Sequence, residues 1–304
     1  MNATLGLGTY RIAGEELADA ARRAASSPAA WIDTAPNYTG GCAHRLLAPV
    51  LANHPGLRVA TKTGFLTPGT ARAALAAGVL DQEDAAAGHS LHAPYVRWRL
   101  ERNRAELGRH RLDTLFLHNP ERTTRPDQLH DQLRAAFAVL EEAAAAGHLT
   151  TYGIATWSGF TEHRITVPDL DRLAAEAAGA REHHLRALQL PVSLVMADAF
   201  DQALVGRGPI ADAAALGWQV HASAPLHGGE LPTLATRELA GLLRPGASIP
   251  AVCLAASASC PGVSMLMLST GNPGHWDEAL AALDEGPIPA ESMRKVLDVL
   301  AAPQ

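Results

Sequence analysis

Short apolar runs of β type alternate along the chain with longer stretches whose apolar residues recur at helical spacing. The strand candidates are residues 4–7, 31–33, 58–61, 114–117, 151–154, 187–190, 218–221 and 263–267. Helical spacing is found at 15–25, 44–51, 127–145, 170–178, 210–216, 234–243 and 276–283, and the tail 289–302 predicts one further helix. This alternation predicts an α/β fold.

Eight strands that alternate with helices, with no linker between them, favour one closed architecture. We expect a (β/α)8 TIM barrel, a single domain over residues 1–304, rather than an open doubly wound sheet. The longest irregular stretch, residues 64–93, contains Pro68, Gly69, Gly78 and Gly88 and only a weak helical patch at 71–80. A loop of this length in a compact domain is usually functional or mobile.

Composition narrows the class of protein. The chain is 47% hydrophobic and 18% charged, which is typical of globular domains. Its formal net charge of −6 argues against nucleic acid as a partner. No apolar run reaches membrane-spanning length, no signal sequence begins the chain, and three cysteines form no disulfide or zinc pattern. We therefore expect a cytoplasmic protein without a membrane partner.

Four polar side chains stand where strands end. Asp33 and Tyr38 follow the second strand candidate, Lys62 ends the third and His118 ends the fourth. In a (β/α)8 barrel these ends converge on the active-site face. Taken singly, each residue also has a structural reading: a turn cap, a loop aromatic, a solvated strand end and a histidine before a proline turn.

Several motifs that include these residues occur in a fixed order along nearly the whole chain. They are LGLGT at 5–9, DTAPNY at 33–38, ATK at 60–62, LHNPE at 117–121, GI at 153–154, APL at 224–226 and NP at 272–273. In these motifs the chain resembles the aldo-keto reductase family. The resemblance implies an enzyme that reduces the carbonyl group of a small molecule with NADPH or NADH, bound in extended form. The chain has no G-x-G-x-x-G loop, which agrees with that mode of binding.

Elementary chemistry explains why these four residue types belong together. Carbonyl reduction needs a proton donor, and a free phenol, with a pKa of about 10, is poorly matched to neutral pH. We assign Tyr38 as general acid, with Lys62 lowering its pKa and Asp33 keeping the lysine charged and oriented. His118 is expected to donate a hydrogen bond to the carbonyl oxygen.

The residues that the resemblance implies for cofactor binding depart from the family pattern. They are Gln189, Thr156, Ser223, Ser269, Thr270, His275 and Glu278. Ala155-Thr156 replaces a Ser-Asn pair, Ser223 replaces a tyrosine that stacks on nicotinamide, and Ser269 or His275 stands for a basic residue that binds the 2′-phosphate. Unless Arg207 or Arg237 substitutes, we expect NADPH and NADH to bind weakly, with little preference, or not at all.

Two classes of function therefore remain open, with a nucleotide-binding regulatory subunit as a distant third. One is an oxidoreductase with altered cofactor contacts, and the other is a redox-neutral lyase, dehydratase, isomerase or cyclase that uses Tyr38 and Lys62 for proton transfer.

Other residues admit less specific readings. No metal site is expected, because His89 and His92 read as surface histidines, and His183-His184 as solvent-facing. Trp31, Trp157 and Trp276 could line a pocket or pack in the core. The substrate and the oligomeric state cannot be read from the sequence.

Overall fold

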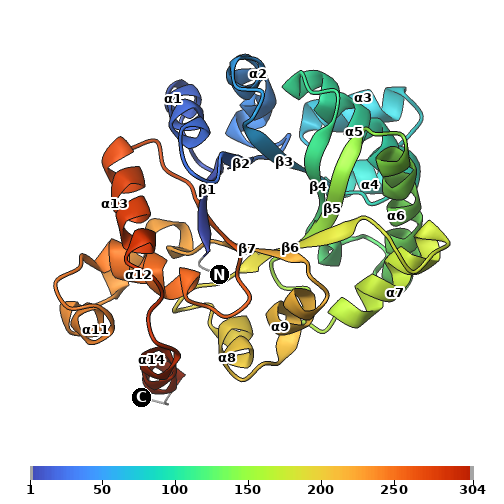
Figure 1. Ribbon diagram of the computed structural model, residues 1–304. Coiled ribbons are helices and arrows are strands. Elements are labelled where there is room, and N and C mark those ends of the chain that lie inside the picture. The colour runs from blue at the N-terminus through green and yellow to red at the C-terminus, as the bar shows by residue number, and fades with distance from the viewer. Residues whose placement is uncertain (1–2, 302–304) are drawn as a thin grey trace.

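The computed structural model describes residues 3–301 and contains a closed barrel of eight parallel strands, in which each strand pairs with its neighbours in chain order. Figure 1 shows the helices forming a ring around the strands. The strands are β1 (Thr4–Gly8), β2 (Trp31–Asp33), β3 (Arg58–Thr63), β4 (Leu112–His118), β5 (Leu149–Ala155), β6 (Leu185–Pro191), β7 (Gln219–Ser223) and β8 (Met265–Leu268). The pairing of β1 with β8 closes the barrel, so the predicted (β/α)8 architecture is confirmed.

The described residues form fourteen α-helices. They are α1 (Gly14–Ala25), α2 (Ala43–Asn53), α3 (Pro68–Ala76), α4 (Gln82–Ala87), α5 (Ala93–Leu107), α6 (Leu129–Ala145), α7 (Val167–Ala178), α8 (Asp198–Leu204), α9 (Gly208–Ala215), α10 (Leu231–Leu234), α11 (Arg237–Leu243), α12 (Ile249–Ala258), α13 (Pro273–Asp284) and α14 (Ala290–Ala301). None of the helices within residues 3–301 is both long and apolar enough to cross a membrane.

The stretch 64–93 is more ordered than the sequence predicts. It contains α3 and α4, and α5 begins at its end. Thr67 and Asp81 cap the two short helices, because their side chains accept hydrogen bonds from the backbone N–H groups of Thr70 and Asp84. These capping residues were the local signal for helix starts within a stretch whose apolar pattern is weak.

Two layers of side chains make up the core. Apolar residues between the strands and the surrounding helices form the larger layer. A smaller cluster inside the barrel includes Trp31, Ala60, Phe116, Met265 and Met267. Trp31 and Trp276 are therefore core residues, whereas Trp157 is half exposed.

The reading of His183 as solvent-facing is wrong. Its side chain is buried, and Nε2 lies 3.0 Å from a carboxylate oxygen of Asp171. Its neighbour His184 does face solvent in part and lies against Glu141. The two adjacent side chains point in different directions, and only one of them meets the packed interior of the protein.

Candidate active site

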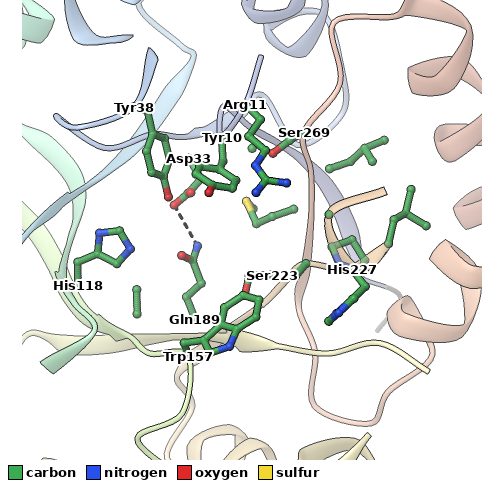
Figure 2. A pocket seen from close by; sticks show the side chains of 18 of the residues that line it. Tyr10, Arg11, Asp33, Tyr38, His118, Trp157, Gln189, Ser223, His227 and Ser269 are labelled. Carbon is green, nitrogen blue, oxygen red and sulfur yellow. Dashed lines mark hydrogen bonds between the residues drawn. The ribbon is translucent and has the colours of Figure 1, made fainter. Parts of the chain in front are cut away.

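Three of the four predicted catalytic side chains line one cavity at the C-terminal end of the barrel. Asp33 ends β2, His118 ends β4, and Tyr38 lies in the connection between β2 and α2. The cavity has a volume of about 780 Å³. Figure 2 shows the three side chains around its mouth. Lys62, in β3, is almost completely buried behind them.

Lys62 and Asp33 form a buried ion pair. The Lys62 ammonium donates to Asp33 Oδ2 over 2.5 Å and to the backbone carbonyl of Thr34 over 3.0 Å. It also lies 5.0 Å from the ring centroid of Tyr38. Burial by itself lowers the pKa of Lys62, but the charge of Asp33 and the contact with Tyr38 outweigh it and raise that pKa overall. The lysine is therefore positively charged at neutral pH.

The second carboxylate oxygen of Asp33 is also held. Gln189, in the second half of β6, donates from Nε2 to Asp33 Oδ1 over 3.0 Å, as Figure 2 shows. A residue expected to serve only the cofactor thus also orients the predicted catalytic carboxylate. No sequence pattern signals this contact, because 156 residues separate its two partners.

Burial raises the pKa of Tyr38 above its ordinary value, and the lowering effect of Lys62 only partly offsets it. The sequence argument considered Lys62 alone and expected a lowered pKa. The difference arises because burial penalises the phenolate, and burial is decided by the fold. Tyr38 consequently carries its proton at neutral pH and is available as a proton donor.

His118 is held neutral beside Tyr38. Burial, followed by the positive charge of Lys62, lowers its pKa well below the ordinary histidine value. Its ring packs edge-on against Phe65 at 4.8 Å and against Tyr38 at 6.4 Å between centroids. A neutral imidazole carries one N–H donor that can face a ligand in the cavity.

His89 supports His118 from behind. Its Nε2 lies 2.8 Å from the His118 backbone oxygen, to which it can donate, and its side chain is buried. The reading of His89 as a surface histidine is therefore wrong. Within the described part of the chain, no group of three or more potential metal-ligating side chains comes together.

The predicted cofactor residues divide into two groups. Gln189, Thr156, Ser223 and Ser269 line the cavity, whereas Thr270, His275 and Glu278 lie outside it. Glu278 accepts a hydrogen bond from Ser248 Oγ, and His275 lies within 3.4 Å of Thr270 and of Asn272. The Thr156 hydroxyl donates to Glu121 over 2.8 Å. Its hydrogen is therefore already used by the carboxylate.

Tyr10 and Arg11 line the cavity although the sequence analysis did not name them, and Trp157, read as a pocket or core residue, lines it as well. Tyr10 and Arg11 follow β1 directly, and Trp157 follows β5. All three come just after a strand, which is the same signal that identified Asp33 and His118. Arg207 and Arg237, proposed above as substitutes for the missing phosphate contact, do not line the cavity.

The lining of this cavity could hold a nicotinamide dinucleotide. The volume of the cavity lies within the range of ligand sites, roughly 300–1,000 Å³. Gln189, Ser223 and Ser269 offer polar side chains, and the turn after β7 exposes backbone at His227, Gly228 and Gly229, all with positive φ. His275 and Glu278 add nothing to this lining, because they lie outside the cavity.

Solved structures with the same architecture include known reductases. An aldo-keto reductase from Klebsiella pneumoniae in complex with NADPH has 17% identity and a TM-score of 0.67, with coverage of 100% of this chain and 97% of that one. A glycerol dehydrogenase from Gluconobacter oxydans has 17% identity and a TM-score of 0.69, with coverage of 98% and 91%. A thermostable aldo-keto reductase in complex with the inhibitor epalrestat has 21% identity and a TM-score of 0.65, with coverage of 98% and 94%. At these identities the likeness establishes the fold alone.

Sequence comparison is more decisive at the level of the family. No curated protein matches the chain. The family model described as "Aldo/keto reductase family", however, matches residues 3–301, which is almost the entire chain. This match covers the barrel and every residue of the cavity described above. The chain belongs to the aldo-keto reductase family.

Proposed function

We propose that the protein reduces the carbonyl group of a small molecule with NADPH or NADH, and that Tyr38 is the general acid. The observation that carries this proposal is the convergence of Tyr38, His118 and the Lys62–Asp33 pair at one cavity. Four residues from three separate strand ends meet there, and their protonation states suit the reaction.

The chain's own residues provide binding and proton transfer. A nicotinamide, when bound, would supply the hydride. Tyr38 holds the proton that the carbonyl oxygen takes up, and neutral His118 donates a hydrogen bond that orients this oxygen. The Lys62 ammonium stabilises the phenolate left after proton transfer, while Asp33, itself held by Gln189, keeps the ammonium in place.

The walls of the cavity suit a partly apolar substrate. Tyr10, Phe65 and Trp157 provide aromatic surface around Tyr38 and His118. The rings of Tyr10 and Tyr38 lie 5.2 Å apart between centroids. A carbonyl compound with a planar or apolar body would bury this body against these rings.

A redox-neutral acid/base enzyme is the second candidate, and specific contacts favour it. The Thr156 hydroxyl is bound to Glu121 and one amide hydrogen of Gln189 to Asp33, so both groups are partly occupied. Ser223 offers no ring on which nicotinamide could stack. In this reading Tyr38 and Lys62 transfer protons without a hydride donor.

The two candidates are separated by cofactor titration followed by turnover of a panel of aldehydes and ketones. Tyr38→Phe removes only the hydroxyl, so we expect turnover to fall by about 10²-fold or more while cofactor binding and the melting temperature stay nearly unchanged. Tyr95→Phe is the matched control, because that buried hydroxyl in α5 lies outside the cavity. Full activity in Tyr38→Phe would contradict the assigned role. No binding of either nucleotide by the native protein would favour the redox-neutral candidate.

A further inference from the structure

A buried asparagine of α5 binds the backbone of the predicted catalytic lysine. Asn103 is fully buried and donates from Nδ2 to the Lys62 carbonyl over 3.0 Å. Two residues earlier in β3, the Ala60 carbonyl accepts from the Thr34 backbone N–H over 2.9 Å. Two residues further along both segments, the equivalent donor to Lys62 would be Pro36, which has no N–H. Asn103 therefore supplies the donor that β2 cannot provide beside Lys62.

Arg99 fixes the orientation of the Asn103 amide. Its Nε donates to Asn103 Oδ1 over 2.7 Å, so the oxygen and the nitrogen of the amide both have partners. Turning the amide over would place donor against donor and acceptor against acceptor. Arg99 is itself buried, and its Nη2 donates to a carboxylate oxygen of Glu106. Asn103 is consequently held in one orientation, with its donor facing β3.

The contacts continue from Glu106 back to β3. His44, in α2, lies 3.0 Å from Glu106 through Nδ1 and 2.8 Å from the Thr61 hydroxyl through Nε2. Burial lowers the pKa of His44, so its ring is neutral at pH 7. In that form Nδ1 donates to the carboxylate and Nε2 accepts from Thr61. Two consecutive residues of β3, Thr61 through its side chain and Lys62 through its backbone, are thus bound to α2 and α5.

The position of the Lys62 backbone determines where its ammonium lies. Nζ is 2.5 Å from Asp33 Oδ2 and 5.0 Å from the ring centroid of Tyr38, and the side chain is almost completely buried. Charge interactions at a buried site are strong and depend on distance, so a small shift of β3 changes how well the ammonium stabilises a Tyr38 phenolate. Asn103 can influence this distance although it does not line the cavity.

We propose that Asn103 is a positioning residue, which holds the backbone of Lys62 so that the ammonium stays beside Asp33 and Tyr38. The proposal rests on the proposed function, because it is there that Lys62 serves Tyr38. A purely structural role for Asn103 predicts only a loss of stability when it is replaced. A positioning role predicts in addition that the Lys62 ammonium becomes less well held.

The chain has only two lysines, Lys62 and Lys295, so the state of the Lys62 ammonium can be measured without a substrate. NMR of protein labelled with 15N at lysine Nζ gives one signal for each, and Lys295→Arg identifies the signal of the exposed one. In Asn103→Ala we expect the Lys62 ammonium protons to exchange with water about 10-fold faster than in wild type. Asn103→Ser differs from the alanine variant by one hydroxyl donor and should show an intermediate rate.

Leu100→Ala is the matched control, because it truncates a buried apolar side chain of the same helix and leaves the donor to Lys62 in place. It should lower the melting temperature without accelerating exchange at the Lys62 ammonium. Unchanged exchange in Asn103→Ala, or an equal acceleration in Leu100→Ala, overturns the proposal. If Asn103→Ala does not fold, exchange in Asn103→Ser that is no faster than in wild type overturns it as well.

Turnover links this effect to the reaction. With a carbonyl substrate that the wild type reduces, Asn103→Ala should lower kcat by about 10- to 100-fold with little change in KM. In a Lys62→Met background the same replacement should have no further effect on kcat, because Asn103 acts through Lys62. Additive losses in this double-mutant cycle contradict the proposal. Failure of the reductase function has a different signature, in which the wild type reduces no carbonyl compound while the NMR difference persists.

Discussion

His221 is fully buried inside the barrel, and neither of its ring nitrogens has a hydrogen-bond partner within the described residues. Burial lowers its pKa from 6.5 to about 4. Between these two values the unfolded chain binds a proton that the folded chain does not, so the free energy of unfolding falls as pH falls from about 6.5 to 4. A shift of this size corresponds to about 3 kcal/mol at most.

Replacing His221 by leucine should therefore reduce the fall in the free energy of unfolding as pH falls. Leucine has a similar volume and removes the two unpaired ring nitrogens of His221, whose aromatic neighbours are Trp31 and Phe116. Urea unfolding at pH 7 and near pH 4.5 measures the difference, with His130→Leu on the exposed face of α6 as the control. The argument would be contradicted if the free energy of unfolding fell by the same amount between the two pH values in His221→Leu and in wild type. Some slope should remain, because burial also lowers the pKa values of His44 and His89.

At the scale of elements, Gly153 shows how β5 fits its neighbours. The pairing of β5 with β6 shifts register between Tyr152 and Gly153. A Cβ at Gly153 would lie 2.3 Å from the Ala187 backbone oxygen and 2.7 Å from the Phe116 ring. Neither β4 nor β6 can easily move away from Gly153, because each of them is paired with a strand on both sides. Glycine is thus required by a close approach between strands and not by a turn.

Gly153→Ala should accordingly destabilise the protein by about 1–3 kcal/mol, the usual cost of overpacking a core. Gly56→Ala is the matched control, because nothing lies within 4 Å of the Cβ it would add and its φ is not in the left-handed region. Thermal or urea unfolding of the two variants provides the comparison. A Gly153→Ala protein as stable as Gly56→Ala would show that β5 and β6 can separate without penalty.

At the scale of the whole molecule, the residues expected to distinguish NADPH from NADH bring no positive charge into the cavity. Ser269 is uncharged, and His275 and Glu278 lie outside the cavity. Two charge-assisted contacts to a phosphate would contribute about 3–6 kcal/mol, or roughly 10² to 10⁴ in affinity.

We therefore expect the Kd for NADPH to lie well above the micromolar range and the preference over NADH to be less than about tenfold. Fluorescence titration with both nucleotides under matched salt measures the ratio. Tight NADPH binding with strong discrimination against NADH would contradict this expectation and would require a phosphate contact that a conformational change brings in.

The sequence by itself determined the strands, most of the long helices and the four candidate catalytic residues. Strand and helix periodicities are local, and Asp33, Lys62 and His118 directly follow or end an apolar run, so their common location at one end of a parallel barrel follows from strand direction. Helix α5 was not predicted from the sequence, because its buried face includes the polar residues Arg99 and Asn103. These two residues are bound to each other, and Asn103 donates to the Lys62 carbonyl. A polar network of this kind removes the amphipathic pattern that predicts a helix.

Only the tertiary structure decided which side chains are buried and what they face. Burial raises the pKa of Tyr38, although the sequence argument expected a lower value. The fold also places His89 against the backbone oxygen of His118 and Gln189 against the carboxylate of Asp33. Arg11 and Gly228 are far apart in the sequence, yet closure of the barrel places them together. Periodicity reports the direction of a side chain relative to its own strand or helix. The desolvation and charges that set its chemistry come from residues that only the closed barrel brings near.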